Sequence, residues 1–236
     1  VSSPHSPKQN HLLDALPAAD YARLLPHLEL IPMPLGWAVY EAGGQMRYLY
    51  FPTTSIVSLL YVLENGASAE IAITGNEGLV GVPRFLQAGS MPFTAFVQVP
   101  GAALQMEAGR FDQTVQTVGS DFAEVLARYT HAWCTQLAQH AVCHGHHRVV
   151  QRCARWLLQT HDRVGRATFP LTQEFLAMML GVRRPSVTAV ARHLKQAGLI
   201  EYQRGVIHVL DRPGLEAASC ECYGVMNAYY NRLVHT

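Results

Sequence analysis

The sequence predicts an α+β protein. An N-terminal β-roll of jelly-roll type comes first, then a long helix, then a C-terminal domain built on a helix pair and a β-hairpin. Three observations carry this prediction. Short β-rich segments separated by turns fill residues 28–106, apolar residues recur at three- and four-residue steps over 121–141, and two amphipathic helices meet at a glycine within 172–198. The length of 236 residues is enough for two domains with cores of their own.

The helix pair at Thr172–Gly198 has well-marked ends. Thr172 is a good N-cap, because its hydroxyl can accept a hydrogen bond from a backbone N–H of the first turn. Gly181 provides the left-handed residue that ends the first helix, and Pro185 stands in the first turn of the second, where a missing N–H costs nothing. The apolar spacing predicts buried faces formed by Phe175, Leu176, Met179 and Leu180 and by Val187, Val190, Ala191 and Leu194.

The outward face of the second helix carries hydrogen-bond donors near its N-terminal end. These residues are Arg183, Arg184, Ser186, Thr188 and Arg192. Guanidinium groups and hydroxyls with few carboxylates are what a helix entering the DNA major groove needs. The alternative is an ordinary helical hairpin with a solvated basic face.

A predicted β-hairpin directly after the helix pair favours DNA binding. Strands at Ile200–Tyr202 and Val206–Leu210 bend at Gly205. A hairpin behind a recognition helix is a wing, so the fold expected here is a winged helix-turn-helix, with Arg204 at the tip facing a phosphate. Charge agrees, since residues 148–236 hold 12 Lys and Arg against 6 Asp and Glu, whereas residues 1–147 hold 6 against 11.

A set of motifs runs through the C-terminal third: Leu171-Thr172-Gln173-Glu174, Gly181-Val182, Arg184, Gly198-Leu199-Ile200, Arg204-Gly205 and Leu210-Asp211. Together they resemble the C-terminal domain of the Crp/Fnr transcription regulators. The resemblance implies that Arg184 reads guanine through O6 and N7 and that Thr172 and Gln173 contact phosphates. Pro185 stands where a base-reading Glu is usual, and Ala189 where the cyclic-AMP receptor type has a second Arg, so a different half-site is expected.

The β-rich part predicts strands at Trp37–Tyr40, Arg47–Phe51, Ile56–Leu63, Ser68–Ile73, Phe93–Val99 and Ala102–Met106. Asn65-Gly66 between two of these runs is a strong hairpin signal. In order and length the segment resembles the cyclic-nucleotide-binding β-roll of the same family. An effector pocket is then implied at Glu77, Gly78, Leu79, Val80, Arg84, Phe93 and Thr94.

Two positions of that pocket depart from the pattern of the nucleotide binders. Glu77 follows Asn76 instead of the usual Gly, and Phe93 occupies the place of the arginine that neutralises the cyclic phosphate. A buried phosphate without a cation is costly, and Arg84 is the cation that could replace it. The resemblance therefore implies a subgroup that lacks the phosphate arginine and does not bind cyclic AMP. A cyclic-nucleotide-gated regulator, another ligand or a β-roll that only supports dimerisation stay open as alternatives.

The long helix predicted at Asp121–Ala141 carries an apolar stripe close to the spacing of a coiled-coil seam. Its members are Phe122, Leu126, Tyr129, Trp133 and Leu137. The stripe is expected to form the interface of a homodimer, with an intramolecular core stripe as the alternative. A two-fold dimer would place two recognition helices one DNA turn apart, about 34 Å, and predicts a palindromic site.

Histidines and cysteines crowd residues 131–147: His131, Cys134, His140, Cys143, His144, His146 and His147. His140 with His144, or Cys143 with His147, could share a metal at i,i+4 spacing, so a metal- or thiol-sensing protein is a further alternative. No CxxC or HExxH frame supports it, and Cys220-x-Cys222 is too short to hold zinc alone. No metal and no cofactor are therefore predicted, and these residues are expected at an interface, a hinge or in the core.

The predicted organisation is a β-roll sensor domain at 1–118, a dimerisation helix and hinge at 119–147 and a winged helix-turn-helix domain at 148–236. The expected partners are double-stranded DNA and a second copy of the chain, with RNA polymerase and an unidentified small-molecule effector as open options. No enzyme motif is found. The polar start, the absence of an apolar run of 18 residues and five cysteines without a CxxC pair favour a cytoplasmic protein without a membrane span.

Overall fold

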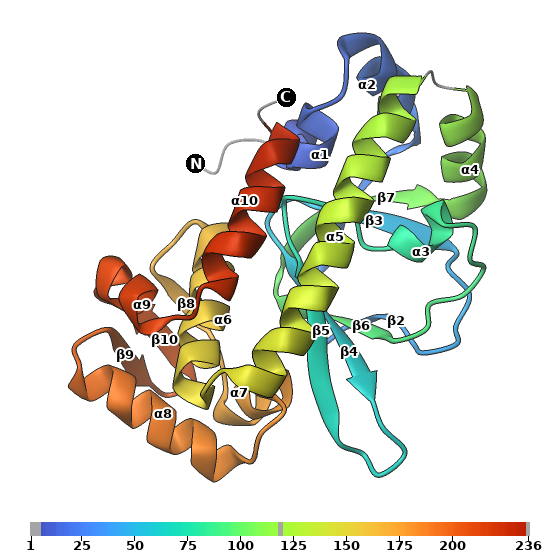
Figure 1. Cartoon of the computed structure of the whole chain (residues 1–236). Helices are drawn as coiled ribbons and strands as arrows, with labels where there is room; N and C mark the ends of the chain where they lie inside the picture. The colour runs from blue at the N-terminus through green and yellow to red at the C-terminus, as the bar shows by residue number, and fades with distance from the viewer. Residues whose placement is uncertain (1–5, 118–119, 235–236) are drawn as a thin grey trace. The chain divides into compact units, whose positions relative to one another are not determined.

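The computed structural model describes residues 6–117 and 120–234, and the chain folds into two compact units (Figure 1). The first unit comprises the chain up to Leu59, Ile73–Cys134 and the end from Tyr229 on. The second comprises Leu60–Ala72 and Thr135–Ala228. The division passes through a β-hairpin and two helices.

The first unit starts with two short helices, α1 (His11–Asp14) and α2 (Ala18–Leu24). Asn10 caps α1, because its side-chain oxygen accepts a hydrogen bond from the Leu13 N–H at 3.2 Å. The Asn10 amide also donates to the carbonyl oxygens of Pro52 and Gly78 at 2.9 and 2.8 Å. One buried side chain thus joins α1 to the end of β3 and to the loop that contains Gly78.

Two antiparallel sheets make the β-roll. Their strands are β1 (Glu29–Met33), β2 (Ala38–Tyr40), β3 (Tyr48–Pro52), β4 (Ile56–Val62), β5 (Ser68–Thr74), β6 (Thr94–Val99) and β7 (Gly101–Glu107). One sheet has the order β1-β7-β3 and the other β2-β6-β4-β5. Strand residues such as Leu49, Phe51, Ile56 and Val97 are fully buried and form its core. The predicted strands are found within one or two residues, and the Asn65-Gly66 hairpin is confirmed, with Gly66 at φ 79°.

Three helices agree less closely with the sequence prediction than the strands do. The short helix α3 (Val82–Phe85) precedes β6, and α4 (Ala108–Thr117), which no sequence signal suggested, follows β7. The predicted long helix is α5 (Ser120–His146), five residues longer at its C-terminal end than expected. The histidine-rich segment therefore continues the helix, because it contains no proline and its first glycine, Gly145, lies at the end.

The aromatic stripe of α5 is packed inside its own chain, which corrects the predicted dimer seam. Phe122, Leu126, Tyr129 and Trp133 are between 0 and 6 % exposed, and Leu137 is half-buried. The Phe122 ring contacts Phe111 of α4, and Trp133 contacts Phe93. Helical spacing marks a stripe that must be covered, but not what covers it, and here the β-roll unit does.

The second unit contains the C-terminal domain. Its elements are α6 (Val149–Val164), β8 (Thr168–Pro170), α7 (Gln173–Leu180), α8 (Arg184–Gln196), β9 (Ile200–Gln203), β10 (Val206–Val209) and α9 (Arg212–Ala218). Strand β8 was not predicted; it pairs with β10 and makes a three-stranded sheet of order β8-β10-β9. After the wing come two helices, α9 and α10 (Cys222–Val234), which are separated at Ser219–Glu221.

Helix α6 organises the interior of the second unit through buried polar groups. Arg155 is 1 % exposed, and its guanidinium donates to Nε2 of His140 at 2.8 Å and to the Gln159 side chain at 2.7 Å. The Trp156 indole N–H donates to the Glu70 carboxylate at 2.9 Å. Because buried polar groups are costly unless they are paired, these bonds fix how α6 packs against the end of α5 and the β4–β5 hairpin inside this unit.

His140 is expected to make folding pH-dependent. Burial, followed by the nearby Arg155 charge, lowers its pKa well below the usual 6.5, so the folded chain holds the neutral imidazole. The unfolded chain takes up a proton below about pH 6.5. The free energy of unfolding is therefore unaffected by protonation of His140 above that pH. It decreases as the pH falls below about 6.5, by about 1.4 kcal/mol per pH unit for one proton.

His140→Gln keeps one acceptor and one donor, and we expect it to flatten the loss of unfolding free energy between pH 6.5 and 5. Urea unfolding of the full chain at several pH values measures this slope. An unchanged slope in the variant would show that His140 titrates freely in the folded state.

Candidate functional site

The helix pair α7–α8 has the capping geometry that its sequence predicts. The Thr172 hydroxyl accepts a hydrogen bond from the Phe175 N–H at 3.1 Å and so caps α7. Gly181 ends α7 at φ 60° and ψ 41°, and Pro185 stands in the first turn of α8. The left-handed residue turns the chain between the two helices, since a residue with a Cβ would be strained there.

The two faces of α8 are divided as predicted. Val187, Ala191 and Leu194 are buried, and Val190 is half-buried. The outward residues Arg183, Arg184, Pro185, Ser186 and Arg192 are exposed, and Thr188 is half-buried. The structure therefore gathers the predicted donors on one side of the N-terminal half of α8, in Figure 1 the helix at the lower left.

Side chains of α8 contact the start of α7. A guanidinium N–H of Arg184 forms an ion pair with the Glu174 carboxylate at 2.8 Å, and both side chains are more than half exposed. The Thr188 hydroxyl donates to the Gln173 side-chain oxygen at 2.9 Å. In the free protein the ion pair with Glu174 holds Arg184 over α7. Because an exposed ion pair contributes little free energy, Arg184 can exchange Glu174 for another acceptor.

The β9–β10 hairpin makes a tight two-residue turn at Arg204-Gly205. Gln203 pairs with Val206, and both turn residues have positive φ, 50° and 75°. Positive φ at both positions is the requirement of a type I′ turn, which suits the twist of a hairpin. Arg204 is exposed at the tip, as expected. The Gly205 carbonyl accepts the Leu171 N–H at 2.7 Å, so the wing is joined to the segment that enters α7.

The segment Glu77–Val80, part of the predicted effector pocket, is closely packed. Glu77 is 8 % exposed, and its carboxylate accepts a hydrogen bond from the Gly75 N–H at 3.0 Å. A Cβ at Gly78 would overlap the Tyr129 ring of α5, and the Tyr129 hydroxyl donates to the Leu79 carbonyl at 3.2 Å. Leu79 and Val80 are both 1 % exposed. The glycine is thus needed for the close approach of α5 to this loop.

The remaining effector residues offer no cation to a phosphate. Phe93 is 6 % exposed, with its ring centroid 6.2 Å from that of Trp133, and Thr94 is half-buried. Arg84 forms a two-bond ion pair with Asp112 of α4, one bond being 2.9 Å, and this bonding raises the pKa of the guanidinium. In this structure Arg84, the cation that could replace the phosphate arginine, is therefore paired with Asp112.

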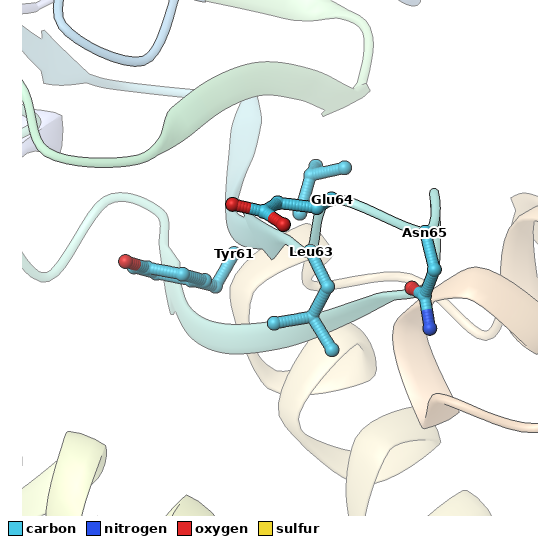
Figure 2. A pocket seen from close by; sticks show the side chains of 5 residues that line it. Tyr61, Leu63, Glu64 and Asn65 are labelled. Carbon is cyan, nitrogen blue, oxygen red and sulfur yellow. The ribbon is translucent and has the colours of Figure 1, made fainter.

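The hollows of the described surface include two whose lining residues are defined. One is a groove beside α3 and α4, lined by Arg84, Phe85, Gln87, Phe111, Asp112, Val115 and Gln116. The other lies at the tip of the β4–β5 hairpin, where Figure 2 shows the Tyr61, Leu63, Glu64 and Asn65 side chains around it. Tyr61, Val62 and Leu63 are each more than half exposed, so this tip is apolar and accessible in the single chain.

Cys143, His147, Cys220 and Cys222 come together inside the second unit, a grouping that the sequence does not reveal. Their ligand atoms all lie within 4.8 Å of one another. The hydrogen bond from Cys220 lowers the pKa of the Cys143 thiol to about 4, and the bond with Cys143 raises the pKa of His147. His140 and His144 do not join them: His140 binds Arg155, and Nδ1 of His144 lies 2.8 Å from the His140 carbonyl oxygen.

Residues 151–218 match the family model of the Crp-like helix-turn-helix domain. The match covers α6 to α9 and includes the helix pair and the wing. No curated protein matches the chain. The C-terminal domain is therefore a helix-turn-helix domain of the Crp type.

Solved structures share the fold of the longer chain at low identity. FixK2 from Bradyrhizobium japonicum is 15 % identical, with a TM-score of 0.70 over 82 % of this chain and 98 % of that one. CLP of Xanthomonas campestris, a c-di-GMP responsive global regulator, is 16 % identical, with a TM-score of 0.67 over 83 % and 100 %. TTHB099 of Thermus thermophilus, a CRP-family transcriptional regulator, is 18 % identical, with a TM-score of 0.66 over 80 % and 96 %.

The domain match and the shared fold define the class of the protein: it is a DNA-binding transcriptional regulator. More particularly, it combines a Crp-like helix-turn-helix domain with the fold of the Crp/Fnr regulators. The resemblance inferred from the motifs between Leu171 and Asp211 is thereby confirmed for the C-terminal domain by the domain match and for the fold by the solved structures. Among the helices of residues 6–117 and 120–234, none has the length and apolar character needed to cross a membrane.

Thr172→Ala is expected to lower the free energy of unfolding by about 1 kcal/mol, because one N–H at the start of α7 loses its cap. Urea unfolding of the full chain measures the loss. Thr172→Ser, which keeps the hydroxyl, is the matched control and should retain most of the stability. Equal losses in both variants would mean that the methyl group, not the cap, matters.

Proposed function

We propose that the protein is a homodimer that binds a palindromic DNA site through α8 and that its β-roll does not bind cyclic AMP. The observation that carries the DNA-binding mode is the outward face of α8, where Arg183, Arg184, Ser186 and Thr188 lie together at the N-terminal end. A helix presented in this way can enter the major groove, with its first turns at the base edges.

Each exposed donor has a role that follows from its place. Arg184 is the base-reading residue, because its planar guanidinium can donate two parallel hydrogen bonds to O6 and N7 of guanine. Thr172 and Gln173 at the start of α7 and Arg204 at the wing tip contact phosphates, which fixes the position of the domain without reading sequence. Arg192, about two turns further along α8 than Arg184, adds charge toward the backbone.

Three features support a β-roll without a cyclic-nucleotide site. The loop at Glu77–Val80 is filled by Tyr129, Phe93 packs on Trp133, and Arg84 is held by Asp112. A cyclic phosphate would be buried there without a cation. The chain is thus assigned to a subgroup that lacks the phosphate arginine. The proposed regulator acts in the cytoplasm. RNA polymerase and an unidentified effector are candidate partners of its DNA-bound dimer.

The dimer uses a different face of α5 from the aromatic stripe. The exposed residues Ala127, His131, Cys134, Ala138 and Ala141 follow one another at four- and three-residue steps, which is heptad spacing. Four of the five have small side chains, so two copies of α5 could approach closely along this face. The inner stripe then holds each α5 on its own β-roll, and the outer one joins the two protomers.

Arg184→Ala should weaken binding to a specific site by about 1–3 kcal/mol, roughly 5- to 150-fold, because one bidentate base contact is lost. Fluorescence anisotropy with a fragment of the protein's own upstream DNA measures the specific constant, and a random fragment measures the non-specific one. Non-specific binding should change little.

Arg23→Ala is the matched control, because it removes one exposed cation from α2 in the first unit. It should leave both constants unchanged. If Arg184→Ala lost equal affinity for specific and random DNA, Arg184 would be a phosphate contact and the proposed reading of bases through it would fail.

The outer seam predicts that Cys134 of one protomer faces Cys134 of the other. A short bismaleimide should therefore join the two protomers of the dimer through these exposed thiols. Covalent dimer on a denaturing gel is the readout, and Cys134→Ser should abolish it. A dimer that light scattering detects but that the reagent does not join would place the interface on another face.

A further inference from the structure

We propose that Cys143, His147, Cys220 and Cys222 bind one Zn²⁺ ion, a structural site that closes the DNA-binding domain. Three thiolates and an imidazole are a ligand set that zinc takes in structural sites. The four ligand atoms lie within 4.8 Å of one another, although they come from two segments more than 70 residues apart.

Two distances between ligand atoms, one between two sulfurs and one between a sulfur and a nitrogen, fit a tetrahedral ion. Zinc–sulfur bonds of about 2.3 Å and zinc–nitrogen bonds of about 2.0–2.1 Å place two sulfurs about 3.8 Å apart and a sulfur and a nitrogen about 3.5 Å apart. The Cys143 and Cys220 sulfurs are 3.5 Å apart, and the Cys222 sulfur lies 3.5 Å from Nδ1 of His147. A small adjustment of side-chain torsions completes the tetrahedron.

Groups around the four residues hold them in the orientation that a metal needs. Nδ1 of His147 faces the sulfurs, while Nε2 lies 3.2 Å from the Glu221 carboxylate. This is the carboxylate–histidine arrangement that fixes the tautomer and ring position of a zinc ligand. The Gln139 amide donates to the Cys222 sulfur at 3.0 Å, and such a bond stabilises a thiolate.

Burial marks the site as closed. Cys143 and Cys222 are fully buried and Cys220 is 5 % exposed, with Met226 beside them. Four protein ligands complete the coordination of zinc, so no position is left for water or a substrate, as expected of a structural site. A cluster of several irons with bridging sulfides takes more room than ligand atoms within 4.8 Å provide.

The position in the chain indicates what the ion does. Cys143 and His147 lie at the end of α5 and just after it, Cys220 lies in the break between α9 and α10, and Cys222 is the first residue of α10. The matched helix-turn-helix domain, residues 151–218, lies between the two pairs. One ion would therefore tie the entry of the domain to its exit, which restricts the unfolded chain and stabilises the domain.

A disulfide between Cys143 and Cys220 is the competing use of these thiols. Their sulfurs are 3.5 Å apart, well beyond the S–S bond length of about 2.05 Å. A disulfide would also use only two of the four groups. It would not explain why Cys222 and His147 lie beside the other two cysteines. Zinc uses all four.

The test measures metal in the full chain, purified with a tag free of histidine and without chelators. Elemental analysis by mass spectrometry should find about one zinc per chain in the parent protein. Cys143→Ser and Cys222→Ser should lose it, and the thermal midpoint should fall by at least about 5 °C. Cys153→Ala and Cys134→Ser are matched controls, one buried cysteine and one exposed, and should keep the zinc.

Two further readouts do not use variants that lack a ligand. Titration of the metal-free parent with Co²⁺ should give the absorption bands of a tetrahedral thiolate site with a stoichiometry of one. Glu221→Gln, which keeps all four ligands, should weaken zinc affinity about 10- to 100-fold. A native parent without metal, in which the buried cysteines are free thiols or Cys143 is joined to Cys220 by a disulfide, would overturn the proposal.

Discussion

The burial of one face of α8 is the constraint on which the proposed function depends. Val187, Ala191 and Leu194 must be covered, and α6, α7 and β9 of the same unit cover them. Once this face is fixed, the arginines and hydroxyls of the opposite face can only project outward. The capped α7 and the left-handed Gly181 then set the angle at which α8 leaves the domain.

The C-terminal domain could be predicted almost completely from the sequence, because its signals are local. A cap at Thr172, a glycine corner at Gly181 and a proline at the start of α8 each act within a few residues. Strand β8 could not be predicted, since Thr168–Pro170 is too short to show a period and becomes a strand only by pairing with β10. Long-range pairing also explains why Cys220 and Cys222 were expected as core residues rather than as neighbours of Cys143.

The predicted dimer seam, in contrast, shows what the sequence pattern cannot determine. The spacing of Phe122, Leu126, Tyr129 and Trp133 established that α5 has a covered face, but the pattern is the same whether a second copy or the chain's own β-roll covers it. Only the contacts with Phe93 and Phe111 decide. Alanine is only weakly hydrophobic, so the exposed alanines on the outer face of α5 do not mark that face in the sequence. The outer face becomes a candidate interface only once the structure shows that the aromatic stripe is buried within its own chain.

The most direct test of the account is selection of binding sites from random DNA by the ligand-free dimer. The account predicts enrichment of a palindrome whose half-sites are centred one helical turn apart, about 10–10.5 base pairs, without any added nucleotide. Enrichment that required cyclic AMP or cyclic GMP would contradict the proposed β-roll. Enrichment of a single half-site would contradict the two-fold dimer on which the palindrome depends.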